Sequence, residues 1–380
     1  MTAINDLKVE LSNMHGMDSR AFLFWKGRVG LYCILKACGI GPGDEVILPA
    51  FTCVVVPNAI LYLGATPIYV DIDKVTLNAG LQKISAAKTK KTRAVICQNT
   101  FGLSSEVDSI ASWAKTEGIY SIEDCTHGFG GYFNESRNGT FCDAAFFSSQ
   151  WNKPISTGLG GYVISKNDYI NERLHVLESN CAKPSFKDVM ELRLQVWLRK
   201  YVMNEFTYWT LLRVYRWLSS HNIVTGSSSG EEILGISMPK DFLKGMSAFQ
   251  AKLALKELSV SNDKNADRKK SAIEYTLFLK SHDRYYVQEN LHGNHLYLKY
   301  PLLVKDRLKF MKLAESARIE LGDWFNSQLH PVQGDLSPWK LNQADFPVSQ
   351  DVASHIVNLP TIGNLGRVIK FLEQNLDEII

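Results

Sequence analysis

Short apolar runs alternate with amphipathic segments through residues 28–165 of the chain. The amphipathic segments have the apolar spacing of helices, and two of them end at glycine. They lie at residues 28–40, 52–65, 77–88 and 104–118. The apolar runs lie at residues 41–49, 66–73, 92–99, 119–125, 143–149 and 160–165. Uniformly apolar strands separated by helices are typical of a mostly parallel sheet that is covered on both faces.

Residues 183–220 differ because they are rich in Trp, Tyr and Arg at helical spacing. With the Gly/Ser loop that follows, they predict a helical insertion over about residues 183–235. Two interpretations are open. The helices pack on the body of the protein or across a dimer, which is the usual fate of an aromatic stripe, or a basic aromatic face lies on a membrane surface.

From about residue 240 the pattern predicts a second, α+β unit. Residues 247–261 and 305–322 are amphipathic helices by their spacing, and residues 284–290 and 295–304 resemble antiparallel strands. We therefore expect a large domain over residues 1–238 and a small domain over residues 239–380.

The composition narrows the class of protein. Hydrophobic residues make up 45% of the 380-residue chain and charged residues 21%, as in ordinary globular enzymes. A net charge of +3 predicts no strong attraction to nucleic acid or to acidic lipid. The seven cysteines include no CxxC pair, which favours buried thiols in a reducing, cytoplasmic compartment. Residues 46–70 carry no charge, but their prolines and glycine favour a strand, a helix and a second strand over a membrane span.

Polar side chains follow consecutive strands of the predicted sheet, and the carboxyl ends of such strands form the ligand site of an α/β sheet. The run at 119–125 delivers Asp124 beside Glu123, and the run at 143–149 is followed by Lys153. The other polar or small residues near these ends and at the first helix are His127, Ser148, Ser149, Gly27 and Arg28.

Each of these residue types has a chemical use. A helix N-terminus with a glycine binds phosphate, and a hydroxyl such as that of Ser148 adds a donor. A carboxylate such as Asp124 can keep a heteroaromatic nitrogen protonated, and a desolvated lysine such as Lys153 can form a Schiff base with an aldehyde. Together they describe a pyridoxal phosphate (PLP) site.

Each residue alone has a commoner structural role: a helix cap, a core histidine, a turn serine or a solvated lysine. Their order on consecutive strand ends favours the site. GLGGY at residues 158–162 precedes a strand, whereas a dinucleotide-binding motif follows one. The nine histidines form no HxH or HxxxH pair, so we expect no metal site.

These motifs resemble the DegT/DnrJ/EryC1/StrS sugar aminotransferases, a family of fold-type I PLP enzymes. The similarity is carried by GRVGLYCILKACGIGPGDEVILPAFTC and AILYLGATPIYVDID, then by FGLSSEVDSI, IEDCTHGFGG, GTFCDAAFFSS and GLGGYVIS in the family's order. It is close over residues 20–170 and looser over residues 236–380. The resemblance implies a large domain with a seven-stranded, mostly parallel sheet, a smaller α+β domain, and a homodimer with its sites at the interface.

The resemblance also implies roles for single positions. Lys153 corresponds to the Schiff-base lysine and Asp124 to the carboxylate that pairs with the pyridine nitrogen. His127 corresponds to a residue that touches the cofactor ring near its phenolic oxygen. The positions that correspond to the phosphate-binding residues are Ser148, Gly27 and Arg28.

The chain departs from the family at two positions. Cys53 stands where the family often has an aromatic residue that stacks on the ring. Leu243 stands where the family tends to offer an Asn to the partner's phosphate site, and Lys244 or Lys240 is a candidate replacement. In the loop at residues 320–345, His330 and Trp324 are candidate substrate contacts or packing residues.

The resemblance implies amino transfer, with glutamate as donor, to a keto sugar that is nucleotide-linked, in surface polysaccharide or related biosynthesis. Relatives that act as sugar dehydratases carry His in place of the lysine, and this chain has Lys153. Dehydration or another PLP reaction on the same fold remains an alternative. A non-catalytic, PLP-binding regulatory protein that uses residues 183–220 as its contact surface is another.

Overall fold

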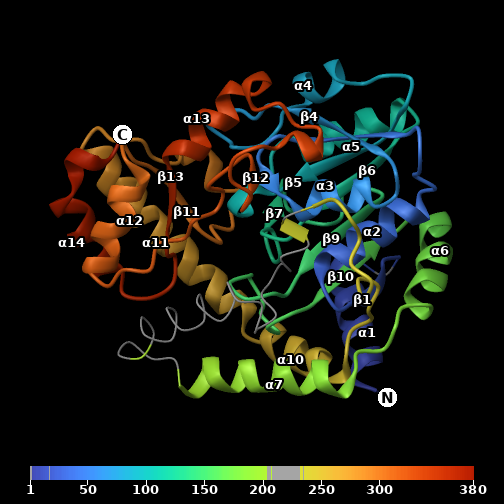
Figure 1. Ribbon diagram of the computed structural model, residues 1–380. Helices are drawn as coiled ribbons and strands as arrows, with labels where there is room; N and C mark the ends of the chain where they lie inside the picture. Colours follow the sequence, from blue (N-terminus) through green and yellow to red (C-terminus); the bar gives the residue numbers. More distant parts are fainter. Residues whose placement is uncertain (1, 17, 203–206, 208–231, 234) are drawn as a thin grey trace.

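The structure is a computed structural model that describes residues 2–16, 18–202, 207, 232–233 and 235–380 (Figure 1). Its centre is a seven-stranded sheet with the strand order β1-β10-β9-β6-β5-β2-β4. These strands are β1 (Arg20–Phe24), β2 (Glu45–Pro49), β4 (Thr66–Val70), β5 (Thr92–Gln98), β6 (Tyr120–Asp124), β9 (Ala144–Ser148) and β10 (Gly161–Ser165). Neighbouring strands from β9 to β4 run parallel, and β10 is antiparallel to both β9 and β1. The predicted sheet is confirmed: six of its strands lie at the predicted apolar runs, and β1 is a strand that the pattern did not predict.

Helices cover both faces of this sheet because successive strand residues point to opposite sides. Val46 and Leu48 of β2 pack in one core with helices α2 (Gly27–Ala37), α3 (Val55–Leu61) and α6 (Asp168–Ser179). Ile47 between them packs on the other face with α4 (Leu81–Ala86) and α5 (Val107–Thr116). Further along that face, α1 (Ala3–His15) and α10 (Ala248–Leu258) cover β1, β9 and β10.

A second core lies in the C-terminal part of the chain, at the left of Figure 1. It joins a two-stranded sheet to helices on its surface. Its elements are α11 (Ser261–Ser281), β11 (Tyr300–Leu303), α12 (Arg307–Ser316), β13 (Ile356–Leu359) and α14 (Leu365–Gln374). The α+β character of this part is as predicted, and the boundary at residue 239 stays a prediction.

The strand predicted at residues 284–290 is wrong. This segment has no regular strand pairing, because the antiparallel partner of β11 is β13 and not the preceding segment. Its backbone groups bond elsewhere: the N–H of Tyr285 donates to the carbonyl of Ile380 at 2.7 Å, and the N–H of Val287 to the hydroxyl of Tyr300 at 3.1 Å.

One segment of the C-terminal part, residues 329–355, packs against the large sheet. Short strand β12 (Leu329–His330) pairs in parallel with β3 (Thr52–Cys53). Helix α13 (Pro347–His355) follows it and packs in a core shared by both parts of the chain. The C-terminal part thus contributes residues directly to the carboxyl edge of the large sheet.

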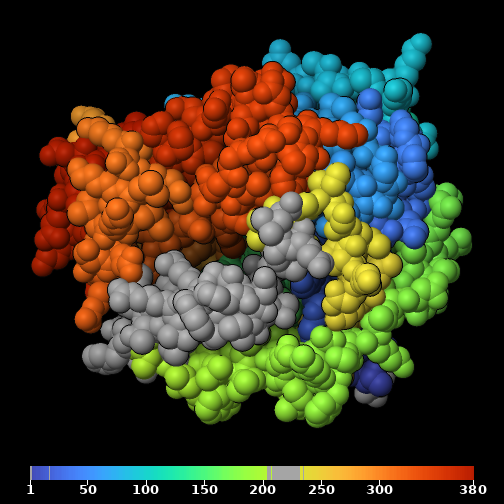
Figure 2. All heavy atoms as spheres, in the orientation of Figure 1, coloured from blue at the N-terminus to red at the C-terminus, as the bar shows by residue number. Residues whose placement is uncertain are grey.

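Helix α7 (Phe186–Tyr201) begins the predicted insertion. It lies along the lower edge of the molecule in Figure 1, where its green atoms also form the surface in Figure 2. Residues 203–206, 208–231 and 234 of the predicted insertion lie outside the described residues. None of the helices within the described residues is both long and apolar enough to span a bilayer.

The start of α2 packs directly on the ends of β9 and β10. A Cβ atom added to Gly161 would lie 2.2 Å from the backbone nitrogen of Gly27, and a Cβ added to Gly27 would lie 2.8 Å from the carbonyl oxygen of Phe147. Real Cβ atoms do not approach backbone this closely. Only glycine at both positions allows the helix terminus to reach the edge of the sheet.

Replacing Gly161 with Ala should therefore push α2 away from β10. We expect a loss of about 2 kcal/mol or more in the free energy of unfolding, because overpacked sites relax only by moving backbone. Urea unfolding followed by circular dichroism measures this. Gly293→Ala is the control, since a Cβ at Gly293 has open space around it. Equal stability of the two variants would contradict the argument.

Candidate active site

Strand β6 sends its two last carboxylates to opposite sides. Glu123 is fully buried, accepts the side-chain N–H of Asn99 at 3.0 Å and accepts the backbone N–H of Gly139 at 2.8 Å. Its pKa is raised by burial. Glu123 therefore holds the loop after β6 in place. Asp124 points to the other side of the sheet edge, towards Lys153.

Asp124 is buried, and the backbone N–H of Thr126 donates to its Oδ1 at 3.0 Å. Burial raises its pKa, while the hydrogen bonds from Thr126 and the charge of Lys153 act in the opposite direction. Among the described residues it forms no ion pair within 4.0 Å. A buried carboxylate in this state favours a cationic partner.

Lys153 lies on the loop after β9, half-buried. Its Nζ atom lies 4.3 Å from the centre of the Trp324 ring, and no hydrogen bond or ion pair with another described residue holds it. Burial lowers the pKa of Lys153 to about 8; Asp124 and Cys53 oppose this shift and Arg28 adds to it. An amine with such a pKa is a nucleophile and a base near neutral pH.

His127 is buried beside the same indole. The rings of His127 and Trp324 stack with their centres 4.7 Å apart and their planes 11° from parallel. The backbone N–H of Phe101 donates to Nδ1 of His127 at 3.2 Å. Burial lowers the pKa of His127 well below its usual value, so the ring is neutral. With Nδ1 accepting, the ring proton sits on Nε2, which is a donor.

Trp324 is positioned by the C-terminal part of the chain. The side chain of Asn358, on β13 and fully buried, accepts the backbone N–H of Trp324 at 2.9 Å and donates to its carbonyl at 2.5 Å. From the sequence, Trp324 was a candidate substrate contact or a packing residue, and Asn358 was not identified. The one signal for Asn358 is a polar residue inside the apolar strand IVNL.

Ser148 and the start of α2 form a cradle of small groups. The Cβ of Ser148 lies 3.2 Å from the point where a Cβ on Gly27 would be. Within the described residues, no side-chain hydrogen bond caps the N-terminus of α2 at Lys26. Free backbone N–H groups at such a terminus, with a hydroxyl beside them, suit a phosphate.

Arg28, in the first turn of α2, is buried and paired. Its Nη1 atom lies 2.6 Å from Oε2 of Glu232, and Nζ of Lys26 lies 3.9 Å from the same oxygen. The pKa of Lys26 is lowered to about 8, mainly by burial. Sequence reasoning missed Glu232, which is far from α2 in the chain and has no motif around it.

The remaining predicted residues are Cys53, Lys244 and Lys240, and their surroundings differ. Cys53 pairs in register with His330 between β3 and β12, and burial raises its pKa. Lys244, a candidate phosphate contact, is held by Asp241 at 2.8 Å and Asp188 at 3.2 Å. Lys240 is exposed.

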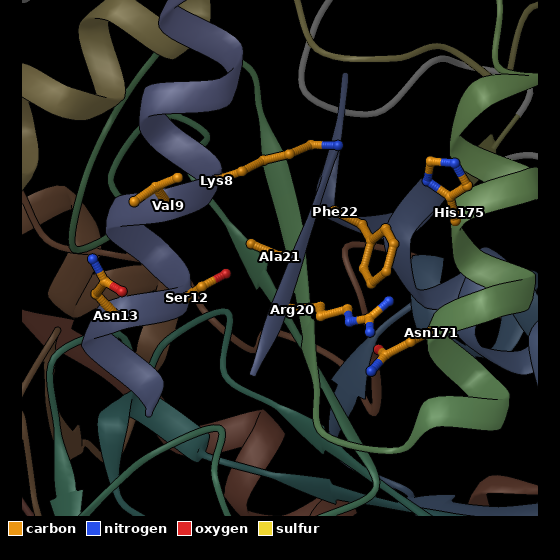
Figure 3. A pocket seen from close by; sticks show the side chains of 9 residues that line it. All are labelled: Lys8, Val9, Ser12, Asn13, Arg20, Ala21, Phe22, Asn171 and His175. Carbon is orange, nitrogen blue, oxygen red and sulfur yellow. The ribbon is translucent and has the colours of Figure 1, made fainter. Parts of the chain in front are cut away.

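Of two cavities in the structure, one lies outside this cluster and the other borders it. The larger, of about 350 Å³, lies at the free edge of β1 between α1 and α6, where Arg20 and Asn171 approach each other (Figure 3). None of the predicted site residues lines it. The smaller, of about 200 Å³, includes Lys26 and Glu232 and so borders the start of α2.

The contact between Lys153 and Trp324 has a measurable consequence. An indole face stabilises an ammonium ion, so Trp324→Leu, which keeps an apolar side chain but removes the π face, should lower the pKa of Lys153 by about half a unit to one unit. Trp324→Phe should fall between the Leu variant and the parent. Competitive labelling of lysines with acetic anhydride in the cofactor-free protein over pH 6–11, read by mass spectrometry, gives the value. Trp197→Leu, at an exposed position, is the control. An unchanged or raised pKa in Trp324→Leu would refute the contact.

Comparison with known proteins begins with a family model. The DegT/DnrJ/EryC1/StrS aminotransferase model matches residues 3–207 and 210–368. The chain is 40% identical over 147 residues to GDP-perosamine synthase of Escherichia coli O157:H7, which is 39% of this chain and 40% of that protein. It is 36% identical over 155 residues to UDP-N-acetyl-3-dehydro-alpha-D-glucosamine 3-aminotransferase of Acidithiobacillus ferrooxidans, 40% of this chain and 42% of that protein. The matched regions thus span about two fifths of these relatives' length.

Solved structures match over nearly the whole chain. A DegT DnrJ EryC1 StrS aminotransferase from Brucella abortus superposes with a TM-score of 0.74 at 18% identity and covers 98% of this chain and 90% of its own. A Bacillus subtilis protein solved with bound cofactor PMP gives a TM-score of 0.73 at 19% identity, covering 100% and 78%. These likenesses confirm the predicted fold, and with the family match they show that the chain belongs to the DegT/DnrJ/EryC1/StrS aminotransferase family.

Proposed function

We propose that the protein is a PLP-dependent aminotransferase that transfers an amino group from glutamate to a keto sugar carried on a nucleotide. The observation that supports this most is the state of Lys153. Its amine has no hydrogen-bond or ion-pair partner among the described residues, its pKa is lowered to about 8, and it faces the same sheet edge as Asp124. The names of the relatives, a GDP-perosamine synthase and an amino-sugar aminotransferase, support a sugar substrate.

The residues present fit the cofactor. The N-terminus of α2, with Gly27 packed against Ser148, directs backbone N–H groups to the place where a phosphate would bind. The buried carboxylate of Asp124 matches a protonated pyridine nitrogen. When bound, PLP supplies a ring that accepts electrons from the bond broken at the substrate carbon.

The chain's own groups would then divide the remaining tasks. Lys153 would hold the cofactor in the resting state and move the proton at the substrate carbon, for which a pKa of about 8 suits it. His127 presents an Nε2–H donor from a neutral ring and would fix the orientation of an oxygen beside it. The indole of Trp324 and the ring of Phe325, which lie face to face with His127, shield this region from water.

Two further features of the proposal rest on the resemblance. Glutamate as donor and a homodimer with shared sites are expected of the family.

We place the contacts to the sugar at the wall around Trp324 and His330, which comes from the C-terminal part of the chain. Cys53, beside His330, leaves the stacking of the cofactor ring to another residue.

Replacing Lys153 with Ala should remove the amine that holds the cofactor and moves the proton. We expect amino transfer from glutamate to a panel of nucleotide keto sugars to fall by at least about 1,000-fold, as for loss of a general acid–base group. The purified parent should be yellow and bleach with glutamate, and the variant should not respond. Lys166→Ala, at an exposed lysine beyond β10, is the control. Turnover retained in Lys153→Ala would rule out the assignment, and dehydration without amino transfer in the parent would favour the dehydratase alternative.

A further inference from the structure

Helix α7 exposes a row of large apolar side chains. Phe186, Trp197 and Tyr201 are 81%, 52% and 63% exposed, and Met190 and Leu194 between them are exposed as well. The spacing of four, four, three and four residues puts all five on one face of the helix. We call this row the outer stripe. Helix α7, which carries it, forms part of the lower surface in Figure 2.

The opposite face of α7 anchors the helix. Leu192 is buried in a small core with Trp25 and Leu159. Asp188 pairs with Lys244 at 3.2 Å, and Arg199 donates to Asn152 at 2.7 Å. The helix start is fixed by a capping box between Ser185 and Asp188. The outer stripe is therefore not needed to hold α7 in place.

The outer stripe limits one interpretation of the sequence. Of the interpretations for this segment, packing on the body of the protein holds only for the opposite face of α7, whereas packing across a dimer or on a membrane stays a prediction for the outer stripe. An exposed row of Phe, Trp, Tyr, Met and Leu is unusual on a protein surface and marks an interaction site.

The charges beside the outer stripe are mostly positive. Arg193 and Lys200 lie along one side of it by helical position, and Lys187 lies along the other with Glu191, 3.7 Å away. Three cations and one anion thus flank the outer stripe. This is a local excess of positive charge on a chain whose net charge is only +3. Long cationic side chains next to an apolar stripe can extend their charges to phosphate headgroups while their stems stay on apolar surface.

We propose that the outer stripe of α7 lies on a bilayer that contains anionic phospholipid. Aromatic and aliphatic side chains would enter the boundary between headgroups and acyl chains, and Lys187, Arg193 and Lys200 would contact the anionic headgroups. A second copy of the chain fits less well, because two stripes packed face to face with antiparallel helices would bring Arg193 and Lys200 of both copies together. The helix would lie in the membrane surface, consistent with its strong anchoring to the body of the protein.

This interaction goes beyond the proposed amino transfer and does not depend on it. A flotation assay with the purified full-length protein tests it. Vesicles of phosphatidylcholine with about 30 mol% phosphatidylglycerol, and of phosphatidylcholine alone, are used at low and high salt. We expect most of the protein to float with the anionic vesicles at low salt, and at least about a fivefold smaller fraction with the neutral ones.

Two variants separate the contributions. Phe186→Ser with Trp197→Ser should abolish flotation, and Arg193→Gln with Lys200→Gln should remove the preference for anionic vesicles. Leu308→Ser, at a position 70% exposed on α12, is the matched control and should float like the parent. Circular dichroism and amino transfer are measured on every variant, so that a failure of the fold or of the proposed reaction is seen separately.

Three results would overturn the proposal. The first is a parent that stays with the unbound fraction, and the second is a stripe variant that floats like the parent. The third is a stripe variant whose only change is the loss of a dimer in light scattering, which would assign the stripe to a second copy of the chain.

Discussion

The approach of α2 to the ends of β9 and β10 is the constraint on which the rest of this site depends. Gly27 and Gly161 are in backbone contact, and no side chain fits between them. This contact places an uncapped helix terminus beside Ser148 at the carboxyl edge of a parallel sheet. The neighbouring strand β6 ends there with Asp124, and the loop after β9 brings Lys153 to the same edge. A helix N-terminus, a carboxylate and an amine therefore share one location because one backbone contact holds the edge together.

Electrostatics at this edge follow from burial. Lys153 and Asp124 are both removed from water, which lowers the pKa of the amine and raises that of the carboxyl, while their attraction opposes both shifts. Arg28 adds positive charge nearby but is compensated by Glu232. The outcome is an amine that can exist uncharged near neutral pH, which a solvated lysine cannot do.

The C-terminal part of the chain completes the site from the other side. Asn358 fixes the backbone of Trp324, and the indole then lies against both His127 and Lys153. The buried amide of Asn358 thus links the small core to Lys153 at the edge of the large sheet. Helix α7 has two different faces. Its inner face packs on the body of the protein, and its outer stripe is exposed and available to a partner.

The sequence by itself determined the sheet, its helices and the cluster of Asp124, His127, Ser148 and Lys153, because these depend on local periodicity and on the rule that parallel strands end at one edge. It failed where a choice depended on long-range contacts. The segment at 284–290 has strand-like residues, but the strand that pairs with β11 is β13. Glu232 lies 204 residues after its partner Arg28, and Asn358 lies 205 residues after Lys153, which it affects through Trp324. Nothing in the local sequence of Glu232 or Asn358 reveals these contacts. Which face of α7 meets the protein was likewise decided only by tertiary structure, because both faces carry apolar residues and only the fold determines which of them finds a partner.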